Sequence, residues 1–375
     1  MGLHAVSEFL RKKHGELLHK EHISLFSHQR VYLDIASYIY KSVCTNGSKS
    51  SKWFNSLIKL ITMFRENWVH VIPVFDGRAP PEKLAEQTDR REKRQKSRER
   101  LTLISQSIDA YQAGDRSQPI MTLLHEEIKG LQKKGADVTS LLKRKPKEED
   151  VDSLPKSFSQ VQLAELSKLC QSLTRQTSYI TETDVKFMQQ MFTACGVTWI
   201  QAPEEAEAYC CWLVKQGLGS AVISCDTDCI AHRADIIIFE LDVIKGDITY
   251  VNLVELMEAW QLTDAQVVDF AILVGCDYNP GSRVNKIGPV RAVDLLQTYG
   301  CIEKIPNLTD LEVLHIDTCR RLFNPTYDTN VVIETITPNE DLLYTTAKER
   351  PDVDMETCLK CIKLNSTAPQ ILLVD

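Results

Sequence analysis

The fold is decided by the stretch Val69-His70-Val71-Ile72-Pro73-Val74-Phe75-Asp76-Gly77, an apolar run that ends in an aspartate and a glycine. A short apolar run bounded by a glycine is typical of a buried strand. The same arrangement occurs where Val31-Tyr32-Leu33 ends at Asp34 and where Ser220 to Cys225 ends at Asp226. The sequence therefore predicts several buried strands, each of which ends in a carboxylate.

Helical patterns separate these strands. Apolar residues recur at helical spacing over Trp53 to Glu66 and over Asp184 to Cys195, and a further strand-like run covers Ile236 to Leu241. Strands that alternate with helices predict an α/β fold with a mostly parallel central sheet that is flanked by helices. Ligands bind such sheets beyond the carboxyl ends of the strands, which is where the closing aspartates are expected to meet.

Composition limits the class of protein. Of the 375 residues, 43% are hydrophobic, which is enough for a sizeable core. No apolar stretch approaches the roughly 20 residues that cross a bilayer, and the 12 cysteines lack the spacing of a small disulfide-bonded domain. We therefore expect an intracellular protein with reduced thiols and no membrane association. A net charge of −7 argues only superficially against nucleic acid, because the position of the cations decides such binding.

The chain is expected to form one domain over residues 1–337, in which an insertion at residues 82–180 separates residues 1–81 from residues 181–305. The insertion is strongly charged and begins with a basic helix around Arg90 to Arg100, followed by amphipathic helical pieces. Residues 338–375 form a carboxyl-terminal extension without a clear fold pattern.

Seven carboxylates form the candidate site: Asp34, Asp76, Glu205, Glu207, Asp226, Asp228 and Asp277. An acid after a strand is often only a turn former or a helix cap, but the joint placement of these seven favours a shared site. Neighbouring carboxylates raise one another's pKa, and hard divalent cations remove that conflict. Two Mg²⁺ ions about 4 Å apart can promote phosphodiester hydrolysis. Calcium storage is a poor alternative, because no twelve-residue loop has EF-hand spacing.

The chain resembles the flap endonuclease, or XPG/RAD2, family of structure-specific 5′ nucleases. The matching motifs occur in the family's order from residue 1 to about residue 305: Met1-Gly2-Leu3, Tyr32 to Tyr40, Val74 to Lys83, Ala202 to Ala208, Asp226 to Cys229, Leu273 to Tyr278 and Ile287 to Ala292. The resemblance implies a PIN-like 5′ nuclease fold in which residues 82–180 are a helical cap over the active site.

The resemblance also implies roles for individual residues. The seven carboxylates would bind two Mg²⁺ ions, for which Mn²⁺ can substitute, and Lys83 and Arg90 would approach the scissile phosphate as catalytic cations. A spacing of seven residues is two helical turns, so both cations are expected on one side of a helix after Asp76. Tyr40 would stack on a base beside the cleaved bond, with core packing as the competing role. Gly2 would lie near the duplex junction.

The segment Gly281 to Ala292, within a helix-turn-helix at about 275–295, resembles the family's duplex-binding loop. The resemblance implies that Lys286, Gly288 and Arg291 contact DNA, because helix N-termini and glycine turns suit phosphates. Relatives carry Gly-Ile-Gly where this chain has Lys286-Ile287-Gly288, and this departure puts the family's K⁺ site in doubt.

The predicted function is cleavage of branched or nicked double-stranded DNA with a 5′ single-stranded flap, together with 5′ exonuclease activity, in replication, repair or recombination. The alternatives are a junction-resolving or RNA-cleaving nuclease of the same fold and a non-catalytic DNA-binding scaffold. We expect a monomer without a sliding-clamp peptide. It would act in the nucleus or, if the protein is viral, at cytoplasmic or nuclear replication sites.

Overall fold

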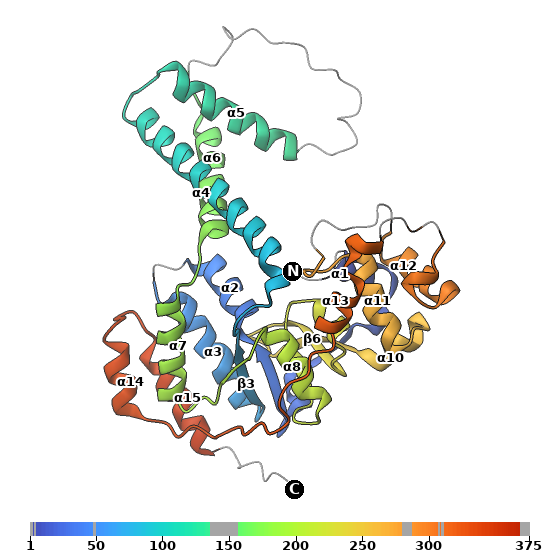
Figure 1. The fold of residues 1–375 in the computed structure, drawn as a ribbon. Helices are drawn as coiled ribbons and strands as arrows, with labels where there is room; N and C mark the ends of the chain where they lie inside the picture. The colour runs from blue at the N-terminus through green and yellow to red at the C-terminus, as the bar shows by residue number, and fades with distance from the viewer. Residues whose placement is uncertain are drawn as a thin grey trace. The chain divides into compact units, whose positions relative to one another are not determined.

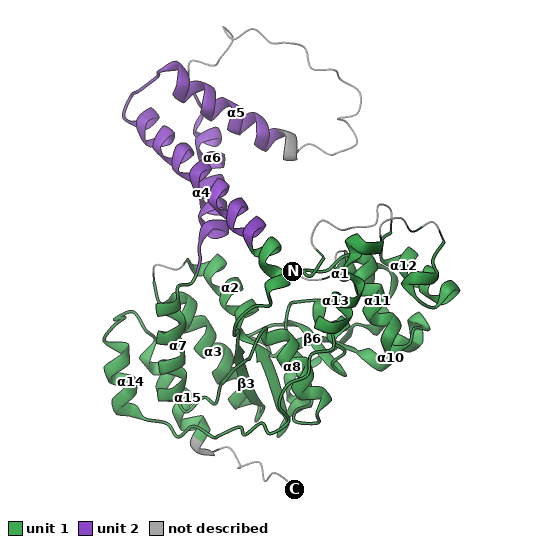
Figure 2. Ribbon diagram, in the orientation of Figure 1, with its two compact units in different colours: residues 1–87, 180–375 green, residues 88–179 purple. Residues whose placement is uncertain are grey.

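The structure, a computed structural model, describes residues 3, 5–47, 50–135, 157–279, 287–306, 308 and 311–367. The chain divides into two compact units, which Figure 2 colours separately. We call Met1–Gln87 together with Ile180–Asp375 the sheet unit, and Thr88–Tyr179 the helical unit.

The sheet unit is built on one seven-stranded sheet with the order β1-β7-β6-β5-β2-β3-β4. Its strands are β1 (His19–His22), β2 (Arg30–Asp34), β3 (His70–Phe75), β4 (Ile200–Gln201), β5 (Ala221–Ile223), β6 (Ile236–Leu241) and β7 (Asp247–Asn252). The five strands from β6 to β4 pair in parallel, whereas β7 pairs antiparallel with both β6 and β1. The predicted α/β sheet is confirmed, with an antiparallel edge that the sequence patterns did not indicate.

Alternate residues of the central strands enter two separate cores. On β2, Val31 and Leu33 belong to one core while Tyr32, between them, belongs to the other; on β3, Val71 and Ile72 divide in the same way. This follows from the two-residue period of a strand, which turns successive side chains to opposite faces. Because both faces are covered, the strands are apolar throughout, and for that reason the sequence showed them as continuous runs.

The helices form one layer on each face of the sheet (Figure 1). The first core contains residues of α1 (Val6–Lys13), α8 (Ala206–Lys215), α9 (Asp228–His232), α10 (Leu253–Trp260), α11 (Asp264–Val274), α12 (Pro289–Tyr299) and α13 (Ile316–Leu322). The second contains residues of α2 (Ile35–Asn46), α3 (Lys52–Glu66), α7 (Glu182–Ala194), α14 (Glu340–Ala347) and α15 (Met355–Thr367). Short 3-10 turns occur between these elements at η1 (Gly15–Leu17), η2 (Ile23–Phe26), η3 (Pro81–Lys83), η6 (Ile302–Lys304) and η7 (Leu311–Leu314).

The helical unit has a core of its own. The helical unit consists of most of α4 (Leu84–Gln112), with α5 (Gln118–Gly135) and α6 (Gln160–Thr177). Apolar side chains from all three helices, including Ile104, Leu124 and Leu166, pack together. Arg100 on α4 also pairs with Glu127 on α5. The amphipathic pieces that the sequence indicated are therefore parts of longer helices. None of the helices in the described ranges is both long and apolar enough to cross a membrane.

Candidate active site

The carboxylates that close the strands meet at one edge of the sheet. Asp34 ends β2, Asp76 follows β3, and Asp226 and Asp228 follow β5. The three strands are parallel, and β2 lies between β5 and β3, so their carboxyl ends share an edge. Ser224 joins two of the acids, because its hydroxyl donates to Asp34 Oδ2 at 2.6 Å and accepts from the Asp226 backbone N–H at 3.0 Å. The loop after β5 is thereby fixed against β2.

The start of α8 brings two more acids to the same edge. Glu205 is the N-cap residue of α8 and Glu207 lies in its first turn. Asp76 Oδ1 accepts a hydrogen bond from the Ala206 backbone N–H at 3.0 Å and so satisfies one of the helix's free amide donors. The adjacent Gly77 is necessary, because a Cβ there would lie 2.1 Å from the Ala202 carbonyl oxygen. Glu205 and Glu207 therefore both lie at the start of α8, and their sharing of one metal site stays a prediction.

Lys83 lies among three of the carboxylates. Its Nζ donates to Glu205 Oε1 and lies 3.4 Å from Glu207 Oε1 and 3.5 Å from Asp277 Oδ2. Tyr278, the residue after Asp277, also contacts one of these acids: its hydroxyl donates to Glu205 Oε2 at 2.7 Å. The segment that follows α11 is therefore joined to the start of α8 through both side chains.

Five of the seven acids are buried, whereas Asp76 is exposed and Asp277 is half-buried, and burial dominates the electrostatics of the site. Burial, with the charges of Asp76 and Asp226, raises the pKa of Asp34 to about 7. Burial likewise raises the pKa of Glu207 and of Asp228 well above the ordinary values. For Lys83, burial alone would lower the pKa, but the charges of Glu207 and Glu205 outweigh it and raise the pKa. The Lys83 ammonium contacts three of the acids, and without further positive charge Asp34, Glu207 and Asp228 keep their protons to a higher pH than ordinary carboxyls do.

The donor set suits a hard divalent cation. All seven predicted ligands offer carboxylate oxygens, the ligand type that Mg²⁺ prefers. Asp228 is 1% exposed, and within the described part of the chain neither of its oxygens has a hydrogen-bond partner. Among the described residues, however, no three acids, histidines or cysteines surround one point as a finished metal site. The Lys83 ammonium takes up carboxylate oxygens instead, so metal binding stays a prediction.

The two predicted catalytic cations differ in position from the expectation. Lys83 is the last residue of η3, directly before α4, so it is not on the regular helix. Arg90 lies on α4 within the helical unit, whereas Lys83 and the carboxylates lie in the sheet unit. The catalytic role of both residues stays a prediction.

The predicted DNA contacts are only partly within the described residues. Tyr40 lies on α2 with its side chain 49% exposed, so it is not a core residue. Gly288 is the N-cap residue of α12, and Arg291 is exposed on the first turn of that helix. Gly2 and Lys286 lie outside the described residues. Helices α11 and α12 pack together, as the predicted helix-turn-helix requires.

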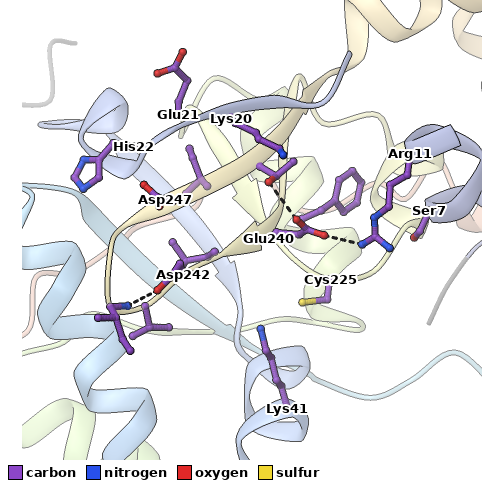
Figure 3. A pocket seen from close by; sticks show the side chains of 16 residues that line it. Ser7, Arg11, Lys20, Glu21, His22, Lys41, Cys225, Glu240, Asp242 and Asp247 are labelled. Carbon is purple, nitrogen blue, oxygen red and sulfur yellow. Dashed lines mark hydrogen bonds and ion pairs between the residues drawn. The ribbon is translucent and has the colours of Figure 1, made fainter. Parts of the chain in front are cut away.

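A groove of about 1200 Å³ lies next to the loop after β5, which carries Asp226 (Figure 3). Cys225, which directly precedes Asp226, lines it together with Lys41 of α2, Lys20 of β1 and Arg11 of α1. Arg11 Nη2 forms a salt bridge with Glu240 Oε1 at 2.6 Å, and both residues line the groove. Four acids, Glu21, Glu240, Asp242 and Asp247, also line the groove, so its charge is mixed and not predominantly basic.

Two members of the cluster, Ser224 and Tyr278, were missed by the sequence interpretation. Tyr278 belongs to the family motif Leu273 to Tyr278 and directly follows Asp277, and this position could have indicated it. Ser224 had only its place at a strand end to mark it, two residues before Asp226.

Comparisons with known proteins agree with this geometry. The XPG N-terminal domain matches residues 1–97, and the XPG I-region matches residues 196–277. The chain is 26% identical over 329 residues to the probable RAD2-like endonuclease 369L of Invertebrate iridescent virus 6, an alignment covering 83% of this chain and 74% of the viral protein. The chain belongs to the XPG/RAD2 nuclease family. The seven carboxylates and Lys83 lie inside the two matched regions.

Solved structures of the XPG/RAD2 family share the fold. Flap endonuclease-1 from Methanococcus jannaschii superposes with a TM-score of 0.60 at 18% identity, covering 95% of this chain and 99% of that one. Human GEN1 in complex with Holliday junction DNA superposes with a TM-score of 0.57 at 14% identity, covering 97% of this chain and 77% of that one. The predictions of the family, the 5′ nuclease fold and a hydrolytic nuclease are confirmed. Nucleases of this family generally depend on divalent metal ions.

Proposed function

We propose that this XPG/RAD2 nuclease hydrolyses phosphodiester bonds at the junction of branched DNA that carries a 5′ single-stranded flap, with 5′ exonuclease activity at the same site. The observation that supports this most strongly is the joining of seven carboxylates from separate segments at one sheet edge, with Lys83 among them. A buried cluster with so much negative charge is costly unless cations bind there.

In this proposal the seven acids hold two Mg²⁺ ions, or Mn²⁺ in their place. Bound there, such ions supply an activated water and charge stabilisation for the leaving oxygen. The protein's part is to hold the ligands: Ser224 fixes Asp34 and Asp226, and Tyr278 fixes Glu205. The Asp228 oxygens, which have no partner within the described residues, are ready to accept a cation without breaking a hydrogen bond.

Lys83 and Arg90 act on the scissile phosphate. Once cations balance the carboxylates, the Lys83 ammonium no longer needs to neutralise Glu205, Glu207 and Asp277 and can turn to the phosphate oxygens. Cations placed where negative charge develops lower the barrier to phosphoryl transfer. Arg90 supplies a second cation from the basic helix α4.

DNA binding is distributed over the sheet unit. The exposed Tyr40 ring stacks on a base next to the cut bond, and Gly2 lies near the duplex junction. Gly288, Arg291 and Lys286 hold the duplex at the helix-turn-helix, with K⁺ as a further candidate ligand there. The enzyme acts as a monomer. Its similarity to an iridescent-virus endonuclease is in keeping with work at viral replication sites.

A junction-resolving nuclease is the second candidate, favoured by the fold shared with GEN1, whose solved structure contains Holliday junction DNA. The test is a cleavage panel with matched 5′-flap DNA, 5′-flap RNA and four-way junctions in Mg²⁺, with every cut mapped. The proposal expects cuts within about one nucleotide of the flap junction and at least tenfold slower cleavage of the other two substrates. Symmetric cuts across the junction at a higher rate would favour the second candidate. Binding without cleavage in Mg²⁺ or Mn²⁺ would favour the scaffold.

A further inference from the structure

Two buried polar side chains without partners lie on the short helix α9. Its first residue is Asp228 and its last is His232, which is 3% exposed. Within the described part of the chain, neither Asp228 oxygen and neither His232 ring nitrogen has a hydrogen-bond partner. Buried polar groups are nearly always paired, and two exceptions on one helix call for a common explanation.

The spacing of the two residues supplies that explanation. Residues four apart on a helix share a face, with Cβ atoms about 5–6 Å apart. Within the described residues the two groups make no direct hydrogen bond, so a water molecule between them would satisfy both. A buried water needs two to four polar partners, and the carboxylate and the imidazole provide them.

The His232 ring is held in place and is neutral. It makes an edge-to-face contact with the Phe323 ring at 5.1 Å between centroids, and Phe323 contacts the Tyr278 ring in the same way at 5.0 Å. Arg233 Nη2 donates to the Phe323 carbonyl oxygen at 3.1 Å, which fixes that segment against α9. Burial, with the charges of Lys83, Arg233 and Lys215, lowers the pKa of His232 to about 3. A neutral imidazole has one donor and one acceptor nitrogen, so it can donate to a water that donates to a carboxylate.

We propose that His232 is a positioning residue for Asp228: through one bridging water, its ring orients the Asp228 carboxylate toward the bound cations. The inference rests on the proposed function, in which Asp228 is a metal ligand. Partners of this kind, placed behind metal ligands, hold the ligand in its binding orientation, and losing one weakens metal binding by about 10- to 100-fold.

The test is Mn²⁺ binding to the DNA-free protein, measured by calorimetry, with thermal unfolding of each variant in EDTA. His232→Phe keeps an aromatic ring against Phe323 but loses both nitrogens. It should fold with an unchanged or higher melting temperature and bind Mn²⁺ about tenfold more weakly. His232→Gln, which keeps a donor and an acceptor, should recover wild-type affinity to within about threefold. Wild-type Mn²⁺ affinity in His232→Phe would overturn the inference.

His70→Phe is the matched control. His70 begins β3, at the opposite end of the strand from Asp76, and its Nε2 is also buried without a partner within the described residues. Its replacement should leave Mn²⁺ binding unchanged; equal weakening in both variants would point to a general packing effect and overturn the inference.

Asp228→Ala separates the inference from the proposed function. If Asp228→Ala binds Mn²⁺ as the wild type does, the metal site itself is wrong. If Asp228→Ala loses binding and His232→Phe does not, only the role of His232 fails. A crystal structure of the wild type with Mn²⁺ tests the same point without any variant: a water between the ring and Asp228 supports the inference, and a ring turned away from Asp228 overturns it.

Discussion

Lys83 shows how the site balances its charge without bound metal. Its ammonium is buried, with the side chain 8% exposed, and is compensated by Glu205, Glu207 and Asp277. Burying an ammonium group in this way is tolerable only with such close partners. The same contacts keep the side chain extended into the site, which is the position from which it can reach a phosphate.

Lys83→Ala should lower the turnover rate by about 100-fold and change DNA affinity little, because the cation acts on charge that develops in the transition state. Single-turnover cleavage and equilibrium binding of the same flap DNA measure the two effects. Lys360→Ala, which removes an exposed lysine of α15 that is paired with Glu66 of α3, is the control for loss of one positive charge. A rise in KM alone, at unchanged turnover, would contradict the catalytic role.

Asp226→Ala should abolish cleavage and leave flap-DNA affinity largely intact. Asp226 is 5% exposed and is tied to Asp34 through Ser224, so its carboxylate belongs to the centre of the cluster and not to the DNA surface. Gel-shift binding and cleavage in Mg²⁺ check both parts. Asp317→Ala, at an exposed position on α13, is the control and should cut at the wild-type rate. Cleavage by Asp226→Ala near that rate is incompatible with the proposed metal site.

At the scale of elements, the carboxyl-terminal helices complete one face of the sheet. Leu343 of α14 and Cys358 of α15 are fully buried in the second core. Arg350, between these helices, pairs with Asp184 at the start of α7 and lies 4.6 Å from the centre of the Phe187 ring. Asp352 also accepts a hydrogen bond from the Ser51 backbone N–H at 2.7 Å, directly before α3. These contacts hold α3 and α7 behind the strands that carry the acids.

Arg350→Ala should therefore reduce the free energy of unfolding by about 2–4 kcal/mol, because it leaves the partly buried Asp184 without its cation and removes an aromatic contact. Urea unfolding gives the value. Metal-dependent cleavage at low temperature should survive, since Arg350 lies among the helices of the second core. A loss below about 0.5 kcal/mol would mean that the terminal helices add little to the stability of the fold.

The strands and helices that could be predicted were those whose own residues form a recognisable pattern. The apolar runs behind Asp34, Asp76 and Asp226 showed β2, β3 and β5 because strands buried on both faces are apolar throughout. Strand β1 is polar and mostly exposed, and β4 has two residues, so neither has a pattern to detect. Helices α14 and α15 depend on residues far away in the chain, such as Asp184 and Ser51, and were not predicted.

The same distinction holds within the candidate site. The carboxylates stood at strand ends or in recognisable motifs, so they were predicted. Ser224 and His232 have no such marker: their importance depends on neighbours brought by folding, and a serine or histidine in an apolar run looks like any other. Lys83 was predicted to lie on a regular helix because it is seven residues from Arg90. That spacing does not reveal that the chain forms a 3-10 turn, η3, at Lys83.

At the scale of the whole molecule, metal-free stability should depend on pH in an unusual direction. The folded-state pKa of Asp34 is about 7 against 3.8 without the fold, and Glu207 and Asp228 shift the same way. The folded protein then binds more protons than the unfolded chain, so the free energy of unfolding falls as pH rises from about 4 to about 7.

Calorimetry in EDTA should therefore show a melting temperature at least about 2 °C higher at pH 5 than at pH 7.5. Carboxyls with lowered pKa, such as Asp184, lose their contribution only at lower pH and leave this window unaffected. The lowered pKa of His232 and of His70 opposes the trend between pH 5 and pH 7.5, because the unfolded chain alone takes up those protons, but the three acids with raised pKa outweigh the two histidines. Millimolar Mg²⁺ should raise the melting temperature mainly at pH 7.5, where the ligands are ionised. Higher stability at pH 7.5 than at pH 5 in EDTA would contradict the assigned environment of these acids.

The most direct measurement is the single-turnover rate of 5′-flap DNA cleavage as a function of Mg²⁺ concentration, for the wild type and for Asp228→Ala. A site that holds two cations should give no cleavage in EDTA, a rate that rises with about the second power of Mg²⁺ concentration before saturation, and cuts at the flap junction. Asp228→Ala should be inactive throughout. Cleavage in EDTA, or an Asp228→Ala protein that cuts at the wild-type rate, would contradict a metal-dependent nuclease site at this edge of the sheet.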